Sequence, residues 1–272
     1  MSHTIPWRII LILVSFFALG SAASVAADEV YRFRPGLHLS REHPLNKDQI
    51  KGLLDGLRFW SGLCEIRFDA EGDLRLGDRS QILAGSNAAR ELIFAAVDSR
   101  DSFSIEDASA SPAIAFAQIE PTETYVVGSD PPRNGWQVRI DFSDFDQLKG
   151  NAEARRAFDP AISLLHELTH GVLDCLDPTD PGDELGAAER YINRIRADLG
   201  LPQRRHYYPR TRIVDGLLKQ SEFTFACAQP NTPERKELII AFDLNRVFDV
   251  TKAKSRAAAQ ASLLAMKHAR RD

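Results

Sequence analysis

The chain has 272 residues, of which 44% are hydrophobic and 26% charged, and its formal net charge is −4. This length can supply one well-packed core. The slightly negative charge gives no electrostatic case for nucleic-acid binding, which would require a basic surface.

The first 27 residues have the form of a secretory signal peptide. Arg8 precedes an apolar run over residues 9–19, and the small residues that follow permit cleavage between Ala27 and Asp28. The run is shorter than a comfortable membrane span, with an uncleaved anchor as the alternative. We therefore expect an exported protein, periplasmic or secreted, with no stable membrane span after cleavage. Its oligomeric state is left open.

Residues 28–272 are predicted to form a single domain of the α+β class. Residues 28–150 supply helices and a small sheet, because apolar residues recur at helical spacing in 46–62 and 87–97. A hairpin is expected around Glu71-Gly72, followed by strands at 114–119, 124–127 and 137–142. Residues 151–210 supply the metal-binding helices. Residues 211–272 supply a strand pair, 223–228 with 237–244, and a basic terminal helix from Thr251.

The segment from His166 to His170 reads H-E-L-T-H. On an α-helix, residues i and i+4 lie one above the other, so His166 and His170 can offer two imidazole nitrogens to one ion. Zinc favours such ligands. Glu167 lies about 100° round the helix from His166, beside the metal face but outside the ligand positions. A carboxylate so placed can act as a general base toward a zinc-bound water, as in metalloproteases.

The residues around this motif predict an amphipathic helix. Pro160 can open the helix, because its missing N–H costs nothing in the first turn. Apolar residues then fall within an arc of about 80°, which forms a core stripe of Ala161, Leu165, Leu168, Val172 and Leu176. The two histidines point away from this stripe, which argues against the alternative of ordinary surface histidines.

A catalytic zinc site has three protein ligands and one water. A second helix is predicted from about Asp183 to Gly200, and it offers Glu184 and Glu189 as candidates for the third ligand. At about 100° per residue, Glu184 falls in the middle of the apolar face and Glu189 toward the polar side. A buried carboxylate needs a partner, and a metal ion is one. The pattern therefore favours Glu184 over Glu189.

Other metal arrangements fit the sequence less well. The form H-E-x-x-H-x-x-G-x-x-H is excluded, because Leu173 and Leu176 occupy the glycine and third-histidine positions. A thermolysin-like layout would use Glu189 with Asn193, both assigned to the polar side. The aspartates at 174, 177, 180 and 183 lack the glycine and terminal glutamate of an EF-hand, so a solvated acidic loop is expected.

Tyr207 follows the second helix by a few residues and could return toward the metal. A phenol there can donate a hydrogen bond to an oxyanion, and a packing aromatic is the alternative. The strand at 137–142 could form the sheet edge or its neighbour, where an extended peptide pairs, or be an ordinary core strand.

The chain has three cysteines, Cys64, Cys175 and Cys227. Export permits disulfides, but the odd count leaves at least one thiol unpaired within a monomer. Cys64 with Cys227 is the favoured bridge, and the sequence does not decide it.

The stretch from Leu164 to Tyr207 matches the sequence pattern of a known group of proteins. The matching residues are Leu164, His166, Glu167, Leu168, His170, Glu184, Ala188, Asn193, Arg196, Leu199, Gly200, Pro202, Arg204 and Tyr207. In these positions the chain resembles the bacterial effector-type zinc metallopeptidases, which also occur as toxin domains. It departs from them at Leu185 and Ile192, where that group often has glutamate. The resemblance implies a zinc peptidase with a zincin-like core, with Glu184 as the third ligand and Tyr207 as the group's tyrosine. It leaves the substrate open.

These patterns predict an exported zinc metallopeptidase in which a small mixed sheet packs on the H-E-x-x-H helix. Zn²⁺ would be held by His166, His170 and Glu184. Glu167 would activate the zinc-bound water, and Tyr207 would assist. The partner would be a peptide or protein substrate. The alternative is a secreted, non-catalytic binding or structural protein in which zinc joins two helices, although structural sites usually have a closed ligand set.

Overall fold

The computed structural model describes residues 33–109, 111–125, 131–179, 184–214, 218–228, 234–243 and 247. The expected signal peptide and C-terminal helix lie outside these residues. Contacts divide the chain into Met1–Arg34 and Pro35–Asp272, and the fold described below belongs to the second unit. Within the described residues, no helix is long and apolar enough to cross a membrane.

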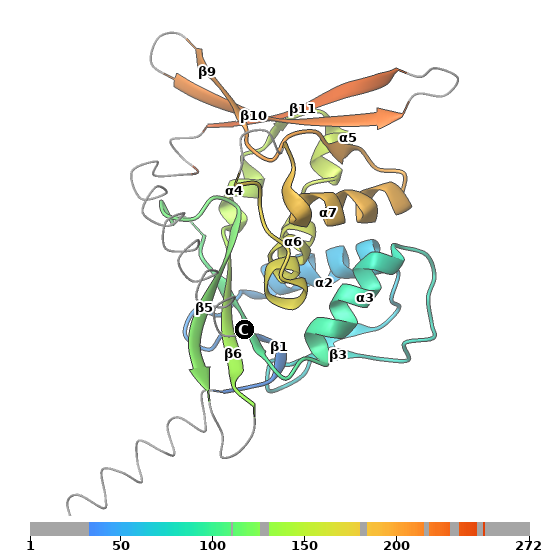
Figure 1. Cartoon of the computed structure of the whole chain (residues 1–272), viewed down its shortest axis with the longest axis vertical. Helices are drawn as coiled ribbons and strands as arrows, with labels where there is room; N and C mark the ends of the chain where they lie inside the picture. The colour runs from blue at the N-terminus through green and yellow to red at the C-terminus, as the bar shows by residue number, and fades with distance from the viewer. Residues whose placement is uncertain are drawn as a thin grey trace, which may run out of the picture. The chain divides into compact units, whose positions relative to one another are not determined.

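A four-stranded mixed sheet forms the base of the fold, in the order β1-β4-β6-β5 (Figure 1). Its strands are β1 (Gly36–Leu39), β4 (Ser102–Asp107), β6 (Arg133–Ile140) and β5 (Ala117–Tyr125). The first three strands run parallel, and β5 pairs antiparallel with β6. The α+β class is therefore confirmed. The predicted strand at 137–142 corresponds to β6, which lies inside the sheet, and β5 occupies the edge of the described sheet.

Three differences from the predicted strands have local causes. Residues 117–119 and 124–125 of the two predicted ranges belong to one strand, β5, whose register shifts between Pro121 and Thr124. Residues 126–127 lie outside the described residues. This strand begins after Phe116, which has a φ of 63° and so breaks extended geometry. β6 ends at Ile140, because Asp141 caps the short helix α4 (Phe142–Asp146). The parallel strands β1 and β4 were not predicted.

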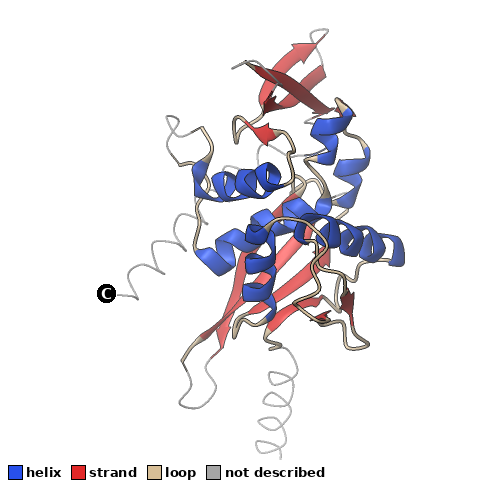
Figure 2. Ribbon diagram, turned by 90° about the vertical axis from the view of Figure 1, so that its right-hand side faces the viewer, coloured by secondary structure: helices blue, strands red, loops and turns tan. Residues whose placement is uncertain are grey.

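Three helices cover one face of this sheet (Figure 2). They are α2 (Lys47–Ser61), α3 (Asn87–Val97) and α6 (Pro160–Leu173). The predictions of α2 and α3 are confirmed, and Asn46 closes a capping box at the start of α2. The shared core is apolar and includes Leu53, Leu57, Trp60, Leu92, Ile93, Phe103, Ile105, Val138, Ile140, Leu165 and Leu168. Because α6 contacts α2, α3, β5 and β6, its position is fixed from several sides.

A second sheet combines one short strand that precedes α6 in the chain with four strands that follow it. It runs β7 (Lys149–Gly150), β11 (Arg235–Asp243), β10 (Leu218–Ala228) and β8 (Gln203–Arg204), with β9 (Arg210–Val214) also paired to β10. The predicted pairing of 223–228 with 237–244 is confirmed as far as Asp243, where the described part of the second segment ends. The two segments form the antiparallel β10–β11 ladder. This sheet has its own core, in which the rings of Phe116, Phe145, Phe158, Phe223 and Phe242 pack against one another.

The remaining elements are the hairpin of β2 (Ile66–Phe68) and β3 (Leu74–Leu76) and the helices α5 (Ala152–Arg156) and α7 (Gly186–Asp198). The hairpin prediction is confirmed. All three cysteines, Cys64, Cys175 and Cys227, are free thiols. The favoured bridge between Cys64 and Cys227 is therefore wrong, and the domain depends on its two apolar cores instead of a covalent link.

Candidate metal centre

Helix α6 presents the two histidines from a firmly held position. Asp159 caps the helix by accepting a hydrogen bond of 2.8 Å from the Ile162 backbone N–H, and Trp60 Nε1 also donates to this carboxylate. On the sheet side, a Cβ at Gly171 would lie 2.5 Å from the Phe103 ring, so glycine permits close packing. The predicted apolar stripe of α6 packs into the core at Ala161, Leu165, Leu168 and Val172. Leu176 does not belong to it, because it lies beyond the end of the helix and is 38% exposed.

Asp177 lies next to His166 and His170 and forms a three-residue group with them. His166 Nε2 lies 3.2 Å from Asp177 Oδ1, and His170 Nε2 lies 3.5 Å from Asp177 Oδ2. One donor atom from each residue lies within 4.8 Å of the others, so the three could hold a metal ion. Two imidazoles and one carboxylate match the three-ligand donor set of catalytic zinc sites.

The chain turns sharply after α6 to bring Asp177 back. Asp174 ends the helix in the left-handed conformation, with a φ of 53°. The Cys175 carbonyl then accepts a hydrogen bond of 2.6 Å from His170 Nδ1. This bond leaves the His170 Nε2 lone pair directed away from the backbone and available to a metal ion.

Glu167 lies beside the group and is 9% exposed. Burial raises the pKa of its carboxyl group, and the two histidines and a hydrogen bond from the Ile119 backbone act in the opposite direction. The bond from Ile119 connects Glu167 to the edge strand β5. A buried carboxylate with a raised pKa is a stronger base than an exposed one.

Glu189 is buried, with 1% of its side chain exposed, and faces His166. Its Oε2 lies 3.4 Å from His166 Nδ1, on the ring edge opposite Asp177. Burial alone would raise the pKa of Glu189, but Arg196 and Arg204 hold it well below its usual range. Glu189 and Asn193, which the sequence placed on the polar side of the helix, are therefore both buried. Both are buried because Arg196 and the segment around Arg204 cover that side of α7.

Glu184 lies outside the group of His166, His170 and Asp177. Its side chain is 64% exposed, and its Oε2 lies 3.6 Å from His206 Nδ1. The physical reason is the start of α7, which begins at Gly186 instead of about 183 and has no side-chain cap. Glu184 therefore precedes the helix, and a helical angle does not describe its direction.

Tyr207 contacts two members of the group, Asp177 and His166. Its hydroxyl donates a hydrogen bond of 2.6 Å to Asp177 Oδ2, and its ring stacks on His166 at 5.9 Å between centroids. Burial, followed by the charge of Asp177, raises the pKa of the phenol well above its usual value. The phenol is thus a protonated donor at neutral pH. Tyr208 donates to the Pro178 carbonyl and is 60% exposed beside the site.

The sequence does not predict Asp177 as a member of this group, because the acidic stretch at 174–183 is expected to form a solvated loop. Its position seven residues after His170, just past the helix end, could have marked it as a candidate. A chain that reverses after a helix can return a side chain to the last turn. No protein-family model, no curated protein and no solved structure matches this chain.

Proposed function

We propose that this chain is an exported zinc-dependent peptidase whose metal ligands are His166, His170 and Asp177. The convergence of these three donors, with Glu167 on the same helix as the two histidines, is the observation that carries the proposal. Asp177 takes the ligand place that the sequence assigned to Glu184. The resemblance to effector-type metallopeptidases and a zincin-like arrangement of α6 and its sheet support a zinc peptidase, although the resemblance implies Glu184 as the third ligand.

The donor set fits zinc for two reasons. Imidazole nitrogen and carboxylate oxygen are usual zinc ligands, and three protein ligands leave a coordination position open for chemistry. Each ligand also has an outer partner, with Glu189 at His166, the Cys175 carbonyl at His170 and Tyr207 at Asp177. Such partners orient metal ligands and fix their tautomers. When bound here, zinc supplies Lewis-acid chemistry by lowering the pKa of water and polarising a carbonyl oxygen.

Glu167 is the general base of the proposed reaction. Its carboxylate takes a proton from the attacking water and passes that proton to the leaving amine as the peptide bond breaks. Its burial favours this role, because removal from bulk water raises the basicity of the carboxylate. The Ile119 N–H fixes its orientation.

Tyr207 is the proposed electrostatic helper. A neutral phenol next to Asp177 can donate a hydrogen bond to the oxygen on which negative charge develops as water adds to the carbonyl. The hydroxyl would then exchange its bond to Asp177 for one to the substrate. The high pKa of the phenol keeps this proton in place at neutral pH.

The edge strand β5 is the proposed binding surface for the peptide backbone. It is the last strand of the described sheet, contacts α6, and connects to Glu167 through Ile119. An extended peptide can pair with such an edge through its own backbone, without any particular side chain. β6, at the predicted strand position, is the neighbour of this edge.

The direct test measures hydrolysis of a broad peptide library by the zinc-loaded mature protein. We expect cleavage that stops after removal of the metal by a chelator and returns on addition of zinc. Zinc-loaded protein that cleaves no peptide in the library would favour the alternative of a non-catalytic binding or structural protein, although with these ligands zinc would join α6 to the following loop instead of two helices.

A further inference from the structure

Arg204 is a buried cation that ties the Tyr207 segment to helix α7. Its Nε donates a hydrogen bond of 3.0 Å to the His206 carbonyl, and its Nη2 donates to the Tyr207 carbonyl. The guanidinium lies 3.9 Å from the centroid of the Phe223 ring, over the second core. Planar donation to two successive carbonyls requires the fork of a guanidinium, which a lysine cannot reproduce.

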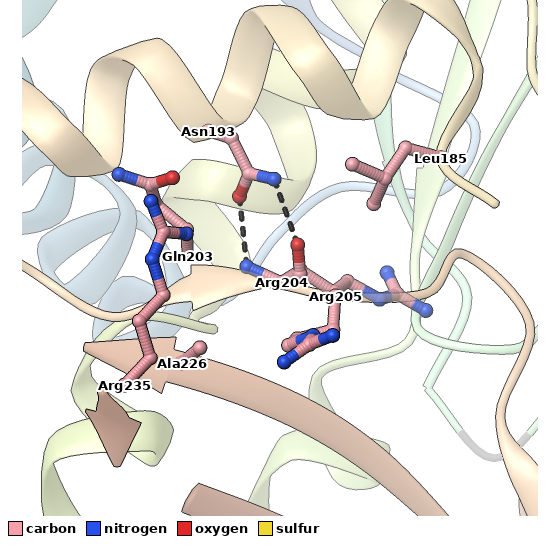
Figure 3. A pocket seen from close by; sticks show the side chains of 7 residues that line it. All are labelled: Leu185, Asn193, Gln203, Arg204, Arg205, Ala226 and Arg235. Carbon is pink, nitrogen blue, oxygen red and sulfur yellow. Dashed lines mark hydrogen bonds between the residues drawn. The ribbon is translucent and has the colours of Figure 1, made fainter. Parts of the chain in front are cut away.

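The backbone of Arg204 is held as firmly as its side chain. Asn193 Oδ1 accepts a hydrogen bond of 2.8 Å from the Arg204 N–H, and Asn193 Nδ2 donates one of 2.8 Å to the Arg204 carbonyl (Figure 3). Helix α7 therefore fixes the point from which the segment 205–207 extends. The neighbouring Arg205 is exposed.

Glu189 connects this anchor to the metal-binding helix. Its Oε2 lies 3.4 Å from Arg204 Nη1 and 3.4 Å from His166 Nδ1. Its other oxygen accepts a hydrogen bond from Arg196, which also donates to the Ala157 carbonyl. A single buried carboxylate thus contacts one candidate metal ligand and the residue that holds Tyr207.

We propose that Arg204 is a positioning residue that sets the Tyr207 hydroxyl against Asp177 and shares Glu189 with His166. This inference rests on the proposed metal site. Arg204 touches none of the three candidate ligands itself, and without it Glu189 keeps its bond to Arg196, so the effect of its removal on zinc binding is expected to pass through Tyr207. The Tyr207 N–H keeps its bond of 2.6 Å to the Glu184 carbonyl, so the loss of Arg204 misplaces Tyr207 without releasing it.

A double-mutant cycle on zinc affinity tests this relationship without any substrate. The full mature chain is compared with Arg204→Met, Tyr207→Phe and the double variant, and Arg205→Met serves as the matched control. We expect Arg204→Met and Tyr207→Phe each to weaken zinc binding by about tenfold, as is typical when a partner of a metal ligand is lost. The double variant should be no weaker than Tyr207→Phe alone, and Arg205→Met should bind as the parent does.

Two further measurements separate positioning from a general structural role. Circular dichroism and the thermal midpoint report folding, and Arg204→Lys replaces Arg204→Met in the cycle if the methionine variant unfolds. On a cleaved peptide, Arg204→Met should lower kcat while KM stays within about threefold, since an oxyanion donor acts in the transition state. Additive losses in the cycle would overturn the proposal, as would an Arg204 variant that matches Arg205→Met. Zinc-loaded protein without hydrolysis would refute the proposed peptidase, and the cycle would still decide the role of Arg204.

Discussion

The Tyr207 hydroxyl and Asp177 Oδ2 lie 2.6 Å apart, although 30 residues separate them in the chain. This hydrogen bond joins the segment after α7 to the loop after α6 at the group that could hold zinc. We expect Tyr207→Phe to reduce kcat on a cleaved peptide by about 10²-fold, the usual cost of removing one oxyanion donor. Steady-state kinetics at saturating zinc measure this effect. A variant with the kcat of the parent would exclude Tyr207 as an oxyanion donor.

The two histidines should be required for metal binding. We expect about one zinc per chain in the parent protein and none in His166→Ala or His170→Ala after dialysis, because each variant keeps only two of the three proposed ligands. Elemental analysis of purified protein gives the stoichiometry. His206→Ala is a suitable control, because His206 lies by Glu184 and outside the group. Full zinc in both histidine variants would place the metal elsewhere.

Asp177 and Glu184 compete directly for the role of third ligand. Asp177→Asn should weaken zinc binding by more than about 10²-fold, because it removes a charged ligand and not merely a supporting contact. Glu184→Gln should leave the affinity within about twofold, since its side chain is 64% exposed and pairs with His206. Competition against a zinc chelator of known affinity measures both. The reverse order would restore the assignment made from the sequence.

Asp144 predicts a pH dependence of stability away from the metal group. It is 1% exposed and accepts a hydrogen bond of 3.0 Å from the Phe116 N–H. Burial, reinforced by the charge of Asp141, raises its pKa to about 7. Between about pH 4 and pH 7 the folded protein therefore holds a proton that the unfolded chain has lost. The stability that this proton contributes is complete below pH 4 and disappears as the pH rises through 7.

Asp144→Asn removes this titration and keeps an oxygen that can accept the Phe116 N–H. The free energy of unfolding of the variant minus that of the parent should rise with pH between about 4 and 7, by at most about 1.4 kcal/mol per pH unit. Urea unfolding at a series of pH values gives this difference. A difference that does not change over the window would show that Asp144 titrates normally.

The sequence was most informative where a single helix determined the outcome. The start of α6 at Pro160 and the placing of His166 and His170 on one face, away from the core stripe, need only helical geometry and the position of apolar residues. The same applies to α2 and α3. These are local properties, and the sequence contains them in full.

Which carboxylate lies beside the two histidines depends on contacts between segments far apart in the chain. Helical angles placed Glu189 on a polar face, but Arg196 and Arg204 neutralise it and allow its burial. Asp177 lies in an acidic stretch, and only the reversal of the chain at Asp174 brings it to the histidines. The sequence does not predict the parallel strands β1 and β4 for a similar reason, because parallel pairing joins segments far apart in the chain.

The substitution Glu167→Gln tests the central claim most directly, because it keeps the size of the side chain and removes the base. We predict that zinc content and the thermal midpoint stay near those of the parent, while cleavage of the peptide library falls by about 10²-fold or more. Glu153→Gln, on the short helix α5, controls for the charge change. Cleavage by Glu167→Gln at the rate of the parent, with zinc content unchanged, would contradict the proposed mechanism.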